Sequence, residues 1–324
     1  MKYVIVAHTD IDGVSASALY DYFQNNNYDK VIYVEPYHLN KLANTILNLK
    51  NIDKIVFTDL GLNDNVFNIF KNTLAHLKNR NIEIEWYDHH VWNDEWITEF
   101  NNIGVKLFID RSTCAVGVVA KYAPRVRESI DDNFVNELVN GVCSADLFRF
   151  DHKLGPWFYR LVRRRSGDDW RKYVFEKISN GVIWCSEFTD KVIELFDKEI
   201  NEYNNIEYNI ELIDVNGLKI GFILNNEYIE SSLLASYVLS KYSLDVAIVA
   251  SIDGKLSIRS RKYNVRNLAY KLGGGGHIKA SGAKVKIPIG IRIKGLVNKQ
   301  TVLKHISKIV SNAIYELGGL DRIE

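Results

Sequence analysis

The sequence predicts an α/β protein: a parallel-sheet domain joined by a helical linker to a smaller α/β domain. Over residues 2–122, short apolar runs alternate with amphipathic stretches, a pattern typical of parallel strands connected by helices. The pattern becomes mainly helical after residue 131, and apolar runs of strand length return beyond residue 205. A chain of 324 residues is long enough to form two such domains.

Short runs rich in β-branched and aromatic residues predict the strands of the first domain. We expect five strands, over 2–8, 30–36, 53–60, 82–90 and 104–110. We expect helices over 13–25, 39–50, 64–79 and 113–122. Ser112 or Thr113 is the expected cap of the last helix, since hydroxyls accept hydrogen bonds from free helix amides.

The domain boundaries follow from the same patterns. The first domain is predicted over 1–185, with its helical portion at 131–185, and a long polar helix over 186–205 forms the linker. The second domain occupies 206–324. Its predicted elements are strands over 207–214, 218–225, 245–253 and 254–261, and helices over 230–241 and 299–317.

Charge and composition limit the classes of partner. Lys plus Arg (41) nearly equals Asp plus Glu (40), which argues against a membrane or long nucleic acid as partner, so any polyanion must be bound locally. No apolar run approaches the roughly 18 residues of a membrane span, and the first residues lack an export signal, so we expect a cytoplasmic protein. Cys114, Cys143 and Cys185 are far apart and lack CxxC spacing, and are therefore expected to be reduced thiols.

Metal-binding residue types follow several predicted strands. His8, Asp10 and Asp12 occupy alternate positions after the first strand, Asp59 follows the third, and Asp88 to His90 follow the fourth. The carboxyl ends of parallel strands form the ligand crevice of an open sheet, so these side chains should converge. Clustered carboxylates repel one another, and a divalent cation relieves that repulsion. A mixed oxygen and imidazole set favours Mn²⁺, Co²⁺ or Mg²⁺.

Each motif also has a simpler interpretation. The first could be a helix cap with two solvated carboxylates, and the adjacent histidines could be a surface pair beside Trp92. The second interpretation is weakened because the histidines follow a predicted buried strand, as the other acidic groups do.

Five motifs, taken together, resemble the DHH phosphoesterase superfamily. They are HTDIDG at 8–13, FTDLG at 57–61, YDHH at 87–90, GVCSADLFRF at 141–150, and GGGGHIKASG at 273–282 preceded by SIRSR. The last pair resembles the substrate-binding DHHA1 domain of that superfamily. The order and spacing cover nearly the whole chain and point to RecJ-type exonucleases, nanoRNases and related phosphodiesterases. The second domain disfavours the family's inorganic pyrophosphatases.

The resemblance implies a centre of two divalent cations, with Mn²⁺ favoured over Mg²⁺ or Co²⁺. One would be held by His8, Asp10 and Asp59, and the other by Asp12, Asp59, His89 and Asp146, with Asp59 bridging. His90 would face the scissile phosphate, with Asp88 as its partner. Relatives often have Asp-Thr-Gly at the fourth motif, whereas Leu147 and Phe148 follow Asp146 here. Asp151 and His152 are close enough to be rival ligands, although such residues at a helix-to-loop junction are more often a cap and a solvated pair.

Two further segments are candidates for substrate binding. The glycine run, with Gly274, Gly275 and Gly276, permits close backbone approach to an anion, and His277 adds a donor; a flexible hinge is the alternative. The resemblance implies that Arg259 and Ser260 contact phosphate or base. The basic segment 157–175, with Arg163 to Arg165 and the aromatic residues Trp157, Phe158 and Trp170, could bind a strand or simply form an amphipathic helix.

These expectations converge on a two-metal phosphodiesterase that hydrolyses short single-stranded RNA or DNA, or linear dinucleotides, to nucleoside monophosphates. The active site is expected between the domains, and a homodimer is compatible with the sequence. The alternatives are a RecJ-like single-strand exonuclease, a cyclic-dinucleotide phosphodiesterase, and a non-catalytic scaffold. The scaffold is disfavoured because the sequence keeps every predicted ligand.

Overall fold

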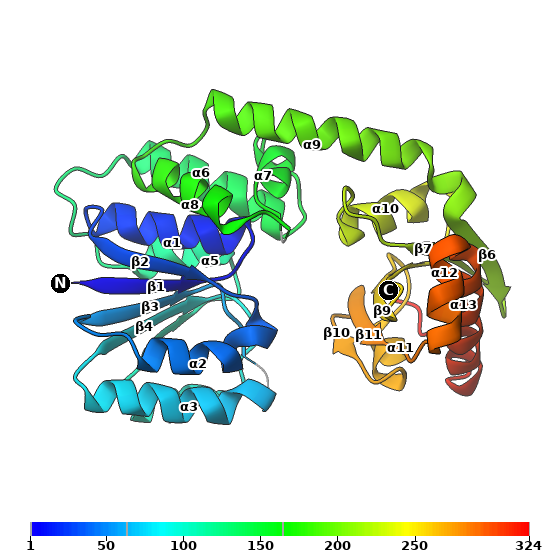
Figure 1. The fold of residues 1–324 in the computed structure, drawn as a ribbon, viewed down its shortest axis with the longest axis horizontal. Helices are drawn as coiled ribbons and strands as arrows, with labels where there is room; N and C mark the ends of the chain where they lie inside the picture. The colour runs from blue at the N-terminus through cyan, green and yellow to red at the C-terminus, as the bar shows by residue number, and fades with distance from the viewer. Residues whose placement is uncertain (1, 63, 164, 324) are drawn as a thin grey trace. The chain divides into compact units, whose positions relative to one another are not determined.

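The structure, a computed structural model, describes residues 2–62, 64–163 and 165–323. The chain forms two compact units, unit 1 (Met1–Val192) and unit 2 (Ile193–Glu324), each with its own sheet and core (Figure 1). The helix α9, Ser186–Asn204, contains the boundary between them. Among the helices of these described residues, none is both long and apolar enough to cross a bilayer.

Unit 1 contains the predicted parallel sheet. Its strands are β1 (Tyr3–Ala7), β2 (Tyr28–Tyr33), β3 (Lys54–Thr58), β4 (Glu83–Asp88) and β5 (Lys106–Ile109). They lie in the order β2-β1-β3-β4-β5, and every neighbouring pair is parallel. The α/β class is thus confirmed, with β2 starting earlier than expected.

Helices cover both faces of this sheet (Figure 1). They are α1 (Ile11–Phe23), α2 (Leu39–Leu47), α3 (Asp64–Asn79), α4 (Asp94–Asn102), α5 (Ala115–Tyr122), α6 (Asp132–Asp146), α7 (Gly155–Leu161) and α8 (Asp168–Ser179). Alternation along β1 sends Tyr3 and Ile5 into the core with α1, and Val6 into the core with α2 and α3. A strand buried on both faces explains the continuous apolar run.

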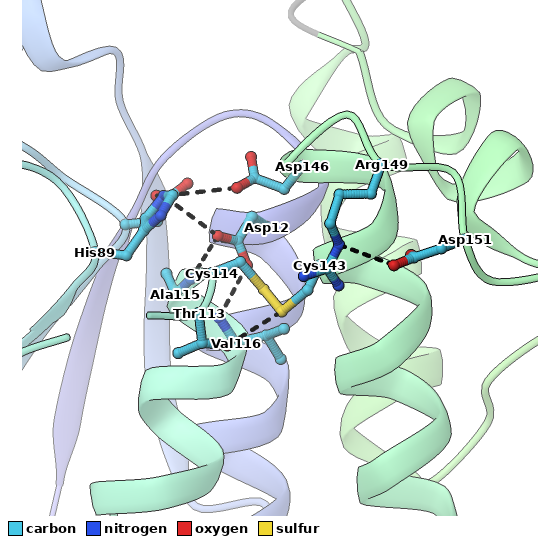
Figure 2. The surroundings of a disulfide bond; sticks show 11 residues. Asp12, His89, Thr113, Cys114, Ala115, Val116, Cys143, Asp146, Arg149 and Asp151 are labelled. Carbon is cyan, nitrogen blue, oxygen red and sulfur yellow. Dashed lines mark hydrogen bonds and ion pairs between the residues drawn. A yellow bond between two sulfur atoms is a disulfide. The ribbon is translucent and has the colours of Figure 1, made fainter. Parts of the chain in front are cut away.

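The cysteine prediction is wrong for two of the three residues. Cys114 and Cys143 form a disulfide between the start of α5 and α6, with Cα atoms 5.2 Å apart, whereas Cys185 is free (Figure 2). Their sequence separation of 29 gives no pattern that would reveal the pairing. Residues of α5 and α6 share the hydrophobic core of unit 1, and this packing brings the two cysteines together.

The predicted cap of α5 is also wrong. The N-cap is Cys114, which makes no side-chain capping bond. The Asp12 carboxylate instead accepts hydrogen bonds from the amides of Ala115 and Val116, at 2.6 and 2.8 Å. A buried carboxyl group from another element thus replaces the local hydroxyl cap.

Unit 2 is built on a mixed sheet in the order β10-β11-β9-β8-β7-β6. Its strands are β6 (Ile210–Val215), β7 (Leu218–Leu224), β8 (Val246–Ala250), β9 (Lys255–Arg259), β10 (Gly275–Gly276) and β11 (Ala280–Lys284). Its helices are α10 (Ser231–Lys241), α11 (Arg266–Lys271), α12 (Ile289–Val297) and α13 (Lys299–Glu316). The sequence did not predict β10, β11, α11 or α12, because these elements are short or rich in glycine.

Candidate metal centre

The candidate metal centre lies where three adjacent strands of unit 1 end. The neighbours β1, β3 and β4 are parallel, so their carboxyl ends meet at one edge of the sheet. His8 follows β1, Asp59 follows β3 and His89 follows β4. Residues far apart in the sequence are thereby brought together, as the strand pattern predicts.

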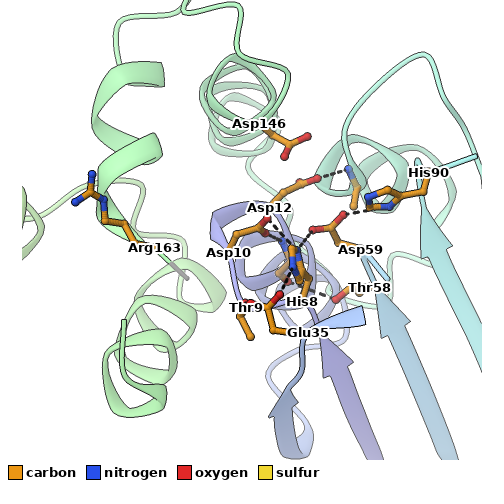
Figure 3. A network of polar contacts seen from close by, with 12 residues as sticks. His8, Thr9, Asp10, Asp12, Glu35, Thr58, Asp59, His90, Asp146 and Arg163 are labelled. Carbon is orange, nitrogen blue, oxygen red and sulfur yellow. Dashed lines mark hydrogen bonds and ion pairs between the residues drawn. The ribbon is translucent and has the colours of Figure 1, made fainter. Parts of the chain in front are cut away.

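The first group of donor atoms belongs to His8, Asp10 and Asp59 (Figure 3). The Nδ1 atom of His8 lies 2.9 Å from Asp10 Oδ2 and 3.2 Å from Asp59 Oδ2. All three donors lie within 4.8 Å of one another, a spacing that one cation could span.

The second group is formed by Asp12, His89 and Asp146 (Figure 2). His89 Nε2 lies 3.8 Å from Asp12 Oδ2 and 3.6 Å from Asp146 Oδ2. It also lies 3.3 Å from Oδ1 of Asp59. The two oxygens of the Asp59 carboxylate thus face different groups, as a bridging ligand would require.

The backbone of Asp59 is held in an uncommon conformation. Its φ is +58°, in the left-handed region that few non-glycine residues adopt, and its amide donates to Tyr87 O at 2.9 Å. Such conformations concentrate at functional sites, where the surrounding fold enforces them. Oδ1 of Asp59 is buried, and although His89 Nε2 lies 3.3 Å away, it accepts no well-aligned hydrogen bond among the described residues. It is a polar atom that a cation would satisfy.

His90 forms a third candidate group with Asp59 and His89, but its shortest contact is to Asp88. Its Nδ1 lies 2.8 Å from Oδ1 of the buried Asp88, whose Oδ2 accepts a hydrogen bond from the Trp92 indole at 2.7 Å. The side chain is 44 % exposed. Gly61 makes this position possible, because a Cβ there would lie only 2.9 Å from His90 Cγ.

Burial and mutual repulsion shift the pKa values of several groups in the cluster. Burial lowers the pKa of His89, but Asp59 and Asp12 outweigh this effect and raise it to about 10. Burial raises the pKa of Asp146 to about 7, with a further contribution from the negative charge of Asp59. Burial and Asp59 likewise raise the pKa of Asp12 well above its ordinary value. These shifts reflect the repulsion between buried carboxylates, which a bound divalent cation would relieve.

Sequence reasoning missed a buried carboxylate next to His8. Glu35 follows β2, the neighbour of β1, and is 8 % exposed. Its Oε1 accepts a hydrogen bond from the Thr9 hydroxyl at 2.6 Å, and its Oε2 lies 3.7 Å from His8 Nε2 (Figure 3). An anion beside Nε2 favours the tautomer whose Nδ1 can bind a metal. A single glutamate at a strand end gives no sequence signal of this role.

The basic aromatic segment 157–175 forms much of a packed helical layer. Phe158 is fully buried, and the Trp170 indole donates to Leu161 O at 2.8 Å while its ring packs on Tyr173. Arg171 is 4 % exposed and donates through Nε to Thr9 O at 2.6 Å. These contacts favour the structural interpretation over strand binding. Arg163 is also buried, and Arg164 lies outside the described residues.

The rival ligands face other partners. Asp151 pairs with Arg149 at 3.1 Å, and Figure 2 shows this pair away from His89. His152 lies 3.5 Å from Glu137. Asp146 is therefore the acidic residue of this segment that joins the cluster.

The predicted substrate residues of unit 2 lie close in sequence to one another but differ in their contacts. Arg259, at the end of β9, donates to Ser232 Oγ at 3.1 Å and to Ile258 O at 3.1 Å. Ser260 is 4 % exposed, and its hydroxyl donates to Asp245 O and accepts from the amides of Lys262 and Tyr263. Its hydroxyl thus shapes the turn.

The glycine run forms a short edge strand. Gly275 and Gly276 pair with β11, and a Cβ at Gly274 would lie 2.0 Å from Gly282 O. Gly276 has a φ of +134°, which side chains rarely adopt. Close strand pairing explains these glycines without an anion. His277 follows them and is exposed.

Comparisons with known families agree with this architecture. Residues 2–145 match the DHH family, N-terminal domain, and residues 219–312 match the DHHA1 domain. A 3',5'-cyclic-nucleotide phosphodiesterase from Helicobacter pylori is 24 % identical over 181 residues, which cover 51 % of this chain. The matched region spans about half of that relative, 50 % of its length.

Solved structures show the same fold at low identity. A pGpG-specific phosphodiesterase from Vibrio cholerae has a TM-score of 0.53 and 15 % identity, over 92 % of this chain and 98 % of the other. Exonuclease RecJ bound to manganese has a TM-score of 0.57 and 12 % identity, over 94 % and 90 %. The motifs, the strand-end cluster and both domain matches place the chain in the DHH phosphoesterase superfamily, with a C-terminal DHHA1 domain.

Proposed function

We propose that this protein is a metal-dependent phosphodiesterase that hydrolyses short single-stranded oligonucleotides or linear dinucleotides to nucleoside monophosphates. The observation that carries the proposal is the pair of donor groups that meet at Asp59. Two cations, one in each donor group, would activate water and stabilise the phosphoryl oxygens of an in-line displacement. Mn²⁺ or Mg²⁺ suits this donor set.

The residues fit that assignment chemically. His8 and Asp10 would complete one site with Asp59, and Asp12, His89 and Asp146 the other. Burial and mutual repulsion raise the pKa values of Asp12 and Asp146, and Oδ1 of Asp59 is buried with only His89 Nε2, at 3.3 Å, beside it. Both features are relieved by divalent cations.

His90 would supply the proton to the leaving oxygen or donate a hydrogen bond to the phosphoryl group. Asp88 holds its Nδ1, so Nε2 is the ring nitrogen available to substrate. Burial lowers the pKa of His90, but Asp88 outweighs it and raises the pKa to about 9. The ring therefore carries the proton that a general acid needs at neutral pH.

We further propose that the substrate is only a few nucleotides long. Arg259 and His277 are the residues of unit 2 that we expect to contact phosphate or base, and the Arg fork suits phosphate oxygens. The packed state of Trp170 and Phe158 removes two candidate stacking platforms for a long strand. These points favour short substrates over the RecJ-like alternative.

A cyclic substrate is the second candidate. The relative from Helicobacter pylori is named a 3',5'-cyclic-nucleotide phosphodiesterase, a name that specifies a cyclic phosphodiester bond but not a dinucleotide. The same metal centre would serve either substrate.

One experiment separates these possibilities. Purified protein with Mn²⁺ is incubated with RNA and DNA of two, five, ten and thirty nucleotides and with cyclic dinucleotides. The proposal expects the highest kcat/KM on two to five nucleotides, with monophosphates as products. A rate that climbs steadily to thirty nucleotides would favour the exonuclease, and hydrolysis confined to cyclic substrates would favour the second candidate. An Asp59→Asn control identifies any contaminating nuclease.

A further inference from the structure

The nearly neutral charge of the whole chain conceals a strongly segregated distribution. Between Asp253 and Glu316 the sequence contains no acidic residue, whereas Lys and Arg recur throughout. This stretch covers β9, α11, β11 and α12, and nearly all of α13. Unit 2 therefore contains an extended cationic segment that the total charge does not reveal.

Within this segment, α12 exposes large aliphatic side chains to solvent. Ile289, Ile293, Leu296 and Val297 are 73, 61, 71 and 92 % exposed. Their spacing of three and four residues places them on one stripe of the helix. A surface helix normally turns such a stripe toward the core, so this orientation is reversed.

The opposite side of α12 is fixed to the body of unit 2. Ile291 packs against the core beside α13. Gly295 is buried, and a Cβ there would lie 2.2 Å from Val302 Cγ2. Close contact on this side keeps the aliphatic stripe facing outward.

Cations flank the stripe on the surface of unit 2. Lys286, Arg292, Lys294 and Lys299 are exposed, and none of their side chains forms an ion pair within the described parts of the chain. We call these four cations and the four aliphatic residues of the stripe the α12 patch. Its partner must supply hydrocarbon and negative charge together.

An anionic bilayer surface offers both features. Aliphatic side chains can enter the boundary between headgroups and acyl chains, while Lys and Arg meet anionic headgroups. A second copy of the chain would oppose cation to cation across a two-fold axis. Nucleic acid would bind the cations but leave the aliphatic stripe in water. We propose that the α12 patch docks unit 2 on anionic membranes as a peripheral contact.

The test is co-sedimentation of the full-length protein with lipid vesicles. One set is phosphatidylcholine alone, and in the other about a third of the lipid is phosphatidylserine, which provides the negative surface potential. Binding is expected only to the second set and should weaken as salt rises. Ile293→Ser with Leu296→Ser should weaken it about tenfold or more, and Arg292→Gln with Lys294→Gln should weaken it as well. Ile69→Ser, an exposed aliphatic on α3, is the matched control and should bind normally.

The double serine variant replaces exposed residues and should keep the circular dichroism spectrum and melting temperature of the parent. If it does not fold, Val297→Ser, at the most exposed position of the stripe, takes its place. Failure to bind anionic vesicles, or binding that the patch variants retain, overturns the proposal. Sedimentation velocity and single-stranded RNA binding are measured on the same variants. A dimer or RNA complex that depends on the patch while vesicles stay unbound would assign the surface to that other partner. None of these readouts depends on hydrolysis.

Discussion

Nδ1 of His90 lies 2.8 Å from Oδ1 of Asp88, and the Trp92 indole holds the other Asp88 oxygen. This arrangement fixes the ring from one side, so that its second nitrogen is presented outward from a half-exposed side chain. The histidine next to it, His89, instead faces the carboxylates of the cluster. Two adjacent histidines thus have different surroundings and, under the proposed function, different tasks.

Replacement of His90 should separate catalysis from metal binding. His90→Ala is expected to lower kcat by about 10²-fold or more, the usual effect of removing a positioned acid or base. Mn²⁺ binding, measured by calorimetry, should stay near normal because His90 is not a proposed ligand. His89→Ala is the neighbouring comparison and should lose metal. The role of His90 is refuted if His90→Ala loses a metal while turnover persists.

Replacement of Asp59 should remove metal binding as a whole. Asp59→Asn weakens both proposed sites, because the two oxygens of this carboxylate face different donor groups. The parent protein should gain about 2.7 kcal/mol of stability when Mn²⁺ is present at a hundredfold excess over its Kd. That gain should vanish in Asp59→Asn and persist in Asp94→Asn, an exposed aspartate of α4. Thermal unfolding with and without Mn²⁺ gives the comparison, and an undiminished shift in Asp59→Asn contradicts the bridging role.

The metal-free protein should become less stable as pH rises. The folded-state pKa values of Asp146 and His89 are raised, to about 7 and about 10. A group with a raised folded pKa stabilises the fold while protonated, and this contribution is lost as pH rises from its unfolded to its folded value. For Asp146 the loss runs from about pH 4 to 7, and for His89 from about pH 6.5 to 10.

Melting temperatures in a chelator, taken from pH 5 to 10, should therefore fall, and Mn²⁺ should reduce the decline because its ligands bind deprotonated. Asp146→Asn should lose the part of the decline below pH 7. A melting temperature that rises across this range in the chelator would contradict the charge balance described for the cluster.

Glu35 should tune metal affinity without touching substrate. Glu35→Gln removes the anion beside His8 Nε2 while keeping an oxygen for the Thr9 hydroxyl, so folding should change little. Loss of such a partner typically weakens metal binding by about 10–100-fold. Calorimetry with Mn²⁺ measures the effect, with Glu95→Gln on the exposed start of α4 as the control. Equal affinities in both variants would leave Glu35 as a packing residue only.

Substitutions in unit 2 should reduce the hydrolysis of oligonucleotides more than the hydrolysis of small substrates. Arg259→Ala and His277→Ala are expected to reduce kcat/KM for a five-nucleotide RNA much more than for a small artificial phosphodiester that contacts only the metal centre. Each lost contact to phosphate should cost about tenfold, the scale of a charge-assisted hydrogen bond. Equal losses on the two substrates would argue against a separate holding role.

The sequence could predict that residues at the ends of different strands converge at one edge of the sheet. Parallel topology brought His8, Asp59 and His89 to the same edge of the sheet. The expected alternation does not extend to Asp12, because Asp10 caps α1 and Asp12 lies in its first turn. The partners that orient these residues carry no such pattern. Glu35 is a lone acid after a strand, and Arg171 lies in a run of ordinary surface composition although it is buried.

The disulfide likewise could not be predicted from the sequence pattern. Cys114 and Cys143 become neighbours only because α5 packs against α6, and no local spacing encodes that contact. Likewise Asp12 replaced the expected hydroxyl cap of α5 from a distant part of the chain. Sequence periodicity predicts elements and the edges at which they end, whereas side-chain partners from separate elements require the packed structure.

The dispersal of the ligands along the chain also dictates when the metal centre can form. His8, Asp59 and His89 follow β1, β3 and β4, and Asp146 ends α6, so no contiguous segment holds a complete site. These contacts are closed only after the long loops between them have been ordered, which is the slow part of assembling a parallel sheet. Under the proposed function, cations would therefore bind a largely finished sheet, and they would slow unfolding without guiding the early steps of folding.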